Sequence, residues 1–170
     1  MEIEKKWYAI YSKPRWEKKI DILLHKKNIH SWCPLQKVEK QWSDRKKIVE
    51  EPLFRSYVFI KIDIATEEKV DVLSTDGVLN FVKYLGKPAV IRDNEVDLIQ
   101  KYLTEKDVKI EVLSLNDFKE NMRVKVNYGI FMDKTGTILH GGKKKVYVQL
   151  KSLGHVMVVE FIKEHLSPAK

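Results

Sequence analysis

The chain has 170 residues, of which 44% are hydrophobic and 33% charged, with a formal net charge of +8. This composition is typical of a soluble protein with one or two small domains. No apolar run approaches the roughly 20 residues that a membrane helix needs, and the first residues do not resemble a signal peptide, so we expect a cytoplasmic protein. Cys33 is the only cysteine, which excludes an intramolecular disulfide.

The positive charge is distributed unevenly. Residues 1–61 carry 15 Lys/Arg against 8 Asp/Glu, residues 62–105 carry 5 against 9, and residues 106–170 carry 12 against 7. A basic first third indicates a polyanionic partner such as nucleic acid. A solvated, lysine-rich surface explains the charge equally well.

The chain begins with a predicted strand followed by a helix. The stretch W-Y-A-I-Y-S (7–12) combines aromatic and aliphatic residues and predicts the strand. Apolar residues recur at helical spacing from Trp16 to Leu24. They predict a helix with Ser12 as its N-cap and Pro14 in its first turn.

A hairpin is predicted next. Residues 29–40 read as a strand, 40–47 as a polar, basic tip and 48–62 as a returning strand. The returning strand has large apolar residues on both faces. Alternation places Phe54, Val58, Ile60 and Ile62 on one face and Leu53, Tyr57 and Phe59 on the other. Two explanations remain open: a core on both faces, or an exposed apolar patch that binds a partner.

Two more helices complete the first part of the chain. Thr66 is expected to cap a short helix that ends at Asp76-Gly77, and residues 78–85 predict a strand. A third helix, capped by Asp93, has its apolar stripe at Val96, Ile99 and Leu103. The order β-α-β-β-α-β-α predicts an antiparallel or mixed sheet with helices packed on it.

The remaining residues change in character. Residues 106–117 predict a linker that is partly extended, and closely spaced alternating strands beyond Phe118 predict a small barrel. The five histidines have no metal-ligand spacing, and neither a nucleophile-elbow motif nor a phosphate-binding loop motif is present. We therefore expect no enzyme activity, no metal and no cofactor.

Four motifs in order carry a family resemblance. They are W-Y-A-I-Y-S-K (7–13), E-P-L-F-R-S-Y-V-F-I (51–60), D-G-V-L-N-F-V with G-K-P-A-V-I (76–82 and 86–91), and V-K-V-N-Y-G-I-F-M-D-K-T-G-T-I (124–138). The chain resembles the NusG family of transcription elongation factors, most closely the specialised RfaH- and UpxY-like paralogues. The resemblance implies an α+β fold: an NGN α/β sandwich at 1–105, a linker at 106–117 and an SH3-like KOW β-barrel at 118–170.

The resemblance also implies partners. In the family, an apolar NGN pocket binds the clamp helices of the largest catalytic subunit of RNA polymerase and suppresses pausing. The matching residues here are Tyr11, Phe54, Tyr57, Phe59, Val96 and Ile99. Upstream or non-template DNA is expected at Lys13 and Arg15 and at the hairpin tip, with Lys40, Trp42, Arg45, Lys46 and Lys47. Ribosomal protein S10 or Rho is expected at Ile130, Phe131, Met132 and Gly136. A monomer without a membrane partner is implied.

Two departures from the family pattern matter. Phe54-Arg55-Ser56 stands where the family has Phe-Pro and a small residue, so the proline-fixed bend is missing. Alternation places Phe54 with the core and the motif places it in the pocket, and a bend near Arg55–Ser56 would reconcile the two. The acidic stretch at 66–71 replaces a threonine-rich contact segment of RfaH. An RNA-binding or ribosome-associated KOW protein is the alternative, and such a protein would not need the aromatic pocket.

Overall fold

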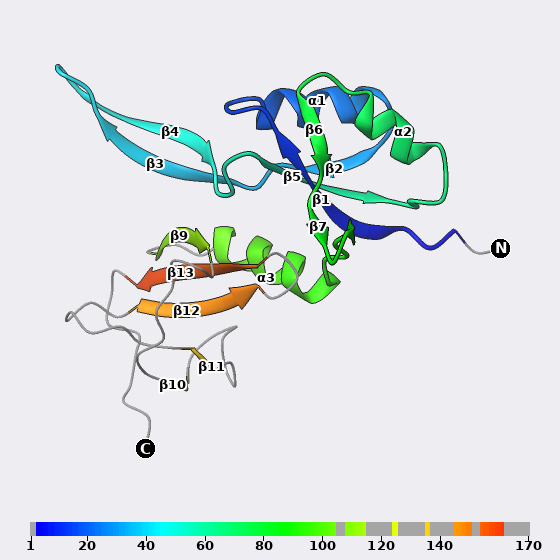
Figure 1. Cartoon of the computed structure of the whole chain (residues 1–170). Coiled ribbons are helices and arrows are strands. Elements are labelled where there is room, and N and C mark those ends of the chain that lie inside the picture. Colours follow the sequence, from blue (N-terminus) through cyan, green and yellow to red (C-terminus); the bar gives the residue numbers. More distant parts are fainter. Residues whose placement is uncertain are drawn as a thin grey trace. The chain divides into compact units, whose positions relative to one another are not determined.

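The computed structural model describes residues 3–104, 108–114, 124–125, 135–136, 145–150 and 154–161 (Figure 1). The chain forms two compact units, Met1–Val96 and Asp97–Lys170. No helix in the described part is long and apolar enough to cross a membrane.

The first unit is built on a four-stranded antiparallel sheet with the strand order β2-β5-β1-β6. Its elements are β1 (Lys6–Ser12), α1 (Glu17–Lys26), β2 (His30–Trp32), β3 (Leu35–Gln41), β4 (Lys46–Pro52), β5 (Tyr57–Ile62), α2 (Glu68–Leu73), β6 (Val78–Phe81), β7 (Lys83–Tyr84) and β8 (Lys87–Pro88). Helix α3 (Asp93–Thr104) begins in this unit and ends in the second.

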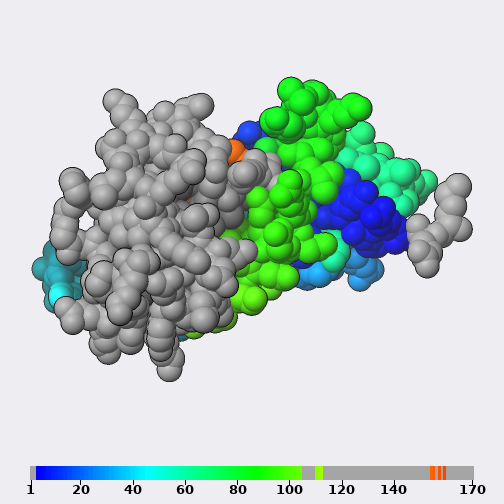
Figure 2. Space-filling model, turned by 90° about the horizontal axis from the view of Figure 1, so that it is seen from below, coloured from blue at the N-terminus to red at the C-terminus, as the bar shows by residue number. Residues whose placement is uncertain are grey.

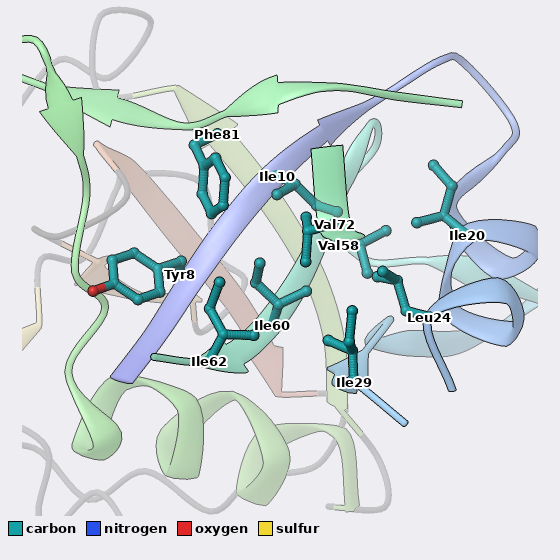
Figure 3. Packing of buried hydrophobic residues seen from close by; sticks show 10 residues of the cluster. All are labelled: Tyr8, Ile10, Ile20, Leu24, Ile29, Val58, Ile60, Ile62, Val72 and Phe81. Carbon is teal, nitrogen blue, oxygen red and sulfur yellow. The ribbon is translucent and has the colours of Figure 1, made fainter. Parts of the chain in front are cut away.

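One face of this sheet holds the core. Opposite residues of β1 and β5, such as Tyr8 with Ile60 and Ile10 with Val58, point to the same side. Ile20 and Leu24 of α1 pack onto them, as Figure 3 shows. The full cluster is Tyr8, Ile10, Ile20, Leu24, Ile29, Val58, Ile60, Ile62, Val72 and Phe81. Burying an isoleucine side chain of this kind contributes roughly 2–3 kcal/mol.

Helix α1 begins later than predicted. Ser12 is not its cap, because Ser12 still belongs to β1 and its N–H donates to Ser56 O at 2.9 Å. The chain must turn before the helix can start. The turn is held by a bond from Lys13 N–H to Gly77 O at 2.8 Å, and the Trp16 ring lies against Gly77.

The predicted hairpin is present but separate from the four-stranded sheet. Strands β3 and β4 pair only with each other, and in Figure 1 they extend away from the sheet as an arm. The predicted strand 29–40 is interrupted at Cys33-Pro34, since proline has no N–H for the ladder. The predicted strand 48–62 is interrupted at residues 53–56.

The two remaining helices differ from prediction at their ends, and in α3 the buried stripe continues through Tyr102, which is fully buried, whereas Leu103 is only partly buried. Thr66 is not the cap of α2, because the N-cap position is held by Glu67, which makes no side-chain cap bond; Thr66 Oγ1 accepts Glu68 N–H at 3.4 Å from the preceding turn. Helix α2 ends at Leu73, before Gly77. The N-terminus of α3 is closed by Glu95, whose carboxylate accepts Arg92 N–H at 3.2 Å, and not by Asp93.

The segment after β6 folds into a small β-hairpin. The predicted strand 78–85 is divided at Val82 into β6 and β7, and β7 pairs with β8. Val82 N–H itself donates to Ala9 O of β1 at 2.8 Å. Ile91 then bridges to Trp7. In the space-filling view, the dark blue residues that begin β1 lie beside the green residues that follow β6 (Figure 2).

The described residues of the second unit include an antiparallel sheet in the order β12-β13-β9. Its strands are β9 (Val108–Ser114), β12 (Lys145–Leu150) and β13 (His155–Phe161), and a further ladder joins β10 (Val124–Lys125) to β11 (Thr135–Gly136). Strand β9 occupies most of the stretch 106–117 in which a linker is predicted. Met157 and Val159 are fully buried.

Candidate functional site

The second face of the four-stranded sheet is aromatic. Tyr11 lies opposite Tyr57, and Trp32 lies opposite Phe59. The ring centroids are 5.1 Å apart in the first pair and 5.6 Å apart in the second. We call Tyr11, Trp32, Phe54, Tyr57 and Phe59 the aromatic face. It follows from the pleat, because each of its strand residues neighbours a buried residue that points to the core face.

Phe54 joins this face through a bend. Residues 53–56 form a turn between β4 and β5, in which Ser56 has φ = 63° and Tyr57 N–H donates to Phe54 O at 3.4 Å. The Phe54 ring meets Phe59 edge to face, with centroids 5.3 Å apart. The predicted bend near Arg55–Ser56 is thus present, and it removes the conflict between alternation and motif.

The predicted pocket residues differ in exposure. Tyr11 is 38% exposed and Tyr57 is half-buried, whereas Phe54 is 2% and Phe59 0% exposed. Val96 and Ile99 are also buried, but Val96 is the last residue of the first unit and Ile99 belongs to the second. A pocket formed by all six residues stays a prediction. Tyr11 and Tyr57 are the members within the first unit that a partner can reach.

The two tyrosines form a polar pair within an apolar setting. Burial raises the pKa of Tyr57, and the hydrogen-bonded hydroxyl of Tyr11 raises it further. Tyr57 therefore keeps its proton throughout the physiological range. The pair offers hydroxyl groups beside flat apolar surface, a combination common in protein interfaces.

The predicted basic residues Lys13 and Arg15 lie exposed in the loop between β1 and α1. The Lys13 ammonium is 5.4 Å from the centroid of the Trp16 ring, and that of Lys19 is 3.9 Å from it. Lys19 was not found from the sequence, because its proximity to this loop depends on where α1 begins. Together these cations make a positive surface around one indole ring.

Some cations of the hairpin tip form ion pairs and others do not. Lys40 pairs with Glu51, and Lys46 lies 3.7 Å from Glu39. The hydrogen bond from Lys40 is the main cause that lowers the pKa of Glu51. Within the described residues, no ion pair involves Arg45 or Lys47.

Trp42 completes the tip. The residue is 53% exposed, and its backbone N–H donates to Arg45 O at 2.8 Å to close the turn. Arg45, Lys47 and Trp42 are therefore the predicted tip residues best placed for an anionic, stacking ligand.

The residues expected to bind ribosomal protein S10 or Rho, which the family places on a turn, fall mainly outside the described residues. Ile130, Phe131 and Met132 are not among them. Gly136 is described and lies in β11, opposite Val124, instead of at a turn.

One constellation that sequence spacing did not reveal is a Ser-His-Asp group at α1 and β2. Ser31 Oγ donates to Asp21 Oδ1 at 2.5 Å and lies 3.1 Å from His25 Nδ1. Ser31 is buried. The Asp21 carboxylate accepts the hydrogen bond of the Ser31 hydroxyl, and the serine faces the same imidazole nitrogen, His25 Nδ1, that lies near Asp21. This is not the geometry of a nucleophilic triad. The group joins α1 to β2. The described residues contain no cluster of His, Cys, Asp or Glu suited to a metal ion.

Comparison with known proteins identifies relatives along most of the chain. A family model described as "Transcription termination factor nusG" matches residues 5–100. Proteins described as "Transcription termination/antitermination protein NusG" are 28% identical in Borreliella burgdorferi (94% of this chain, 96% of the relative) and 28% in Bacillus subtilis (93% and 95%). The relative in Thermus thermophilus is 29% identical (94% and 95%).

A solved structure shows the same likeness. It is described as "Domain interaction in Thermotoga maritima NusG" and has a TM-score of 0.58 at 26% identity, covering 94% of this chain and 98% of the other. The match confirms the predicted α+β fold class.

Proposed function

The chain belongs to the NusG family of transcription termination and antitermination factors, and from that premise we propose that its aromatic face binds RNA polymerase. The partner segment would be the clamp helices of the largest catalytic subunit. Binding there would suppress pausing or termination. The assignment to the RfaH- and UpxY-like branch stays a prediction.

The observation that carries this proposal is the Tyr11–Tyr57 pair at the accessible part of the aromatic face. Tyrosine is enriched in protein interfaces because it gives large, rigid contact area with one polar end. An amphipathic helix can place its apolar stripe on such a surface. The hydroxyl pair can receive a polar group at the edge of that stripe.

Nucleic acid is the second proposed partner. Exposed cations lie in the loop after β1, at Lys13 and Arg15, and at the hairpin tip, at Arg45 and Lys47. Trp42 supplies an exposed ring for stacking at that tip. Cations of this kind supply affinity for phosphates and stacked rings add to it. Upstream or non-template DNA is the proposed ligand. The second unit would recruit ribosomal protein S10 or Rho through Ile130, Phe131, Met132 and Gly136.

The polymerase proposal is tested with Tyr11→Ala and Tyr57→Ala. Each should weaken binding to core RNA polymerase by at least about tenfold in a pull-down or interferometry titration, the size expected at an interface anchor. Ile22→Ala is the matched control, because Ile22 is an exposed apolar residue on α1, which packs on the opposite face of the sheet. Undiminished binding by both tyrosine variants would refute the assignment. Phe54→Ala is unsuitable, since truncating a buried phenylalanine costs about 3–5 kcal/mol of stability.

The nucleic-acid proposal is tested by comparing two double variants. Arg45→Ala with Lys47→Ala should reduce the slope of log affinity against log salt by about 1.4 to 1.8 for single- or double-stranded DNA. Lys40→Ala with Lys46→Ala removes the same charge from ion-paired positions and should reduce it less. Equal effects would show that ion pairing does not select the contact residues. Tighter binding of RNA than DNA would favour the alternative function.

A further inference from the structure

The first two residues of α1 hold the segment that leads into β5. Glu17 is only 5% exposed, and its Oε1 accepts Ser56 N–H at 2.7 Å. Lys18 Nζ donates to Glu50 O at 2.5 Å. One helix turn therefore contacts the chain before the bend at 53–56 and at its last residue.

Ser56 needs such support. Its φ of 63° is in the left-handed region, which residues other than glycine adopt infrequently. Serine therefore does not prefer this conformation by itself. A buried carboxylate that accepts a backbone N–H makes a strong, charge-assisted hydrogen bond, and a buried Glu17 without this partner would be unfavourable. The bond thus favours the one conformation of the bend that presents Ser56 N–H to α1.

The bend determines where the aromatic side chains lie. Phe54 lies within it and Tyr57 directly follows it, and Ser56 O accepts the N–H of Ser12, the residue after Tyr11. If Ser56 left the left-handed region, the hydrogen bond between Ser12 N–H and Ser56 O would break. Phe54 would then leave its edge-to-face contact with Phe59. Both ends of the Tyr11–Tyr57 pair depend on this bend.

We propose that Glu17 is a positioning residue for polymerase binding, which acts by holding Ser56 N–H so that Phe54 and Tyr57 stay on the aromatic face. The inference rests on the proposed function of that face. Glu17 itself makes no contact with the polymerase. The carboxylate replaces the conformational restriction that the family's proline supplies at the preceding position.

The test is a graded series at the two residues. Glu17→Ala should weaken polymerase binding about tenfold or more, and Glu17→Gln, which keeps an acceptor oxygen, should weaken it less. Ser56→Gly should restore most of the binding in the Glu17→Ala background, since glycine adopts positive φ without support. Ser56→Val should imitate Glu17→Ala, because a β-branched residue disfavours this region strongly, and it does so with Glu17 intact.

A second readout does not involve polymerase. Burial and the Tyr11 hydroxyl raise the pKa of Tyr57, so displacement of the bend should let Tyr57 ionise at lower pH. NMR titration of ring-labelled tyrosine, assigned with Tyr57→Phe, should show this shift in Glu17→Ala and its reversal by Ser56→Gly. Circular dichroism at the assay temperature identifies variants that are unfolded.

The outcomes separate two failures. If Glu17→Ala changes neither the Tyr57 titration nor the affinity, or if Ser56→Gly rescues neither, the positioning role is wrong. If the wild-type chain does not bind polymerase while the Tyr57 titration responds as described, the proposed function is wrong and the positioning of the aromatic face by Glu17 stands.

Discussion

The two faces of the four-stranded sheet use the same strands for different purposes. On the face covered by α1 and α2, β1 and β5 contribute mainly aliphatic side chains, such as Ile10 and Ile60, that are completely buried. On the other face most of the alternate residues are aromatic, and Tyr11 and Tyr57 remain partly exposed. Aliphatic groups fill a core without directional demands. Aromatic groups with a polar end suit a surface that is buried in one state and wet in another.

The largest expected difference between the faces is in stability. Ile60→Ala should lower the free energy of unfolding by about 2–5 kcal/mol, because it opens a cavity at a fully buried site. Tyr11→Ala should lower it by less than about 1.5 kcal/mol, since the ring already contacts solvent. Urea denaturation of the two variants measures both values. Equal losses would mean that the sheet has two equivalent cores.

A glycine pair tests how tightly the core face is packed. In Gly77→Ala the new Cβ would lie 2.4 Å from Trp16 Cε3 at φ = +87°, so we expect a loss of about 2–3 kcal/mol. Gly86 has a similar φ of +78°, but a Cβ added there would meet no atom within 4 Å beyond the adjoining residues, and Gly86→Ala should cost about 1 kcal/mol. Thermal denaturation of the two variants gives the comparison. Equal costs would show that the Trp16 ring moves aside freely.

The last effect concerns the thiol of the residue that follows β2, and it arises only at alkaline pH. Burial, then the charges of Asp21 and Glu17, raise the pKa of Cys33 from 9.0 to about 12. The raised pKa stabilises the fold fully below pH 9, and that stability is lost as pH rises toward 12, by up to roughly 1.4 kcal/mol per pH unit. Stability should thus fall more steeply between pH 9 and 10.5 in the wild type than in Cys33→Ala. Parallel slopes in urea denaturation would show that Cys33 ionises normally.

The hairpin arm shows where prediction from sequence stops. Its basic tip could be located from the run of lysines and the polar turn residues. The sequence did not predict which of these cations form ion pairs, because that depends on the strand register. Lys40 reaches Glu51 and Lys46 reaches Glu39 in the pairing that β3 and β4 adopt. Local composition does not encode this pairing, since several registers would keep the tip equally basic.

The sequence by itself determined the alternation of core and aromatic residues in β1 and β5, because the pleat of a strand sends neighbouring side chains to opposite faces whatever surrounds it. It also carried the motifs of the family. The tertiary structure alone decided how Phe54 reaches the aromatic face. That step needs Ser56 in a conformation it does not prefer, and the carboxylate that supports it comes from Glu17, 39 residues earlier in the chain.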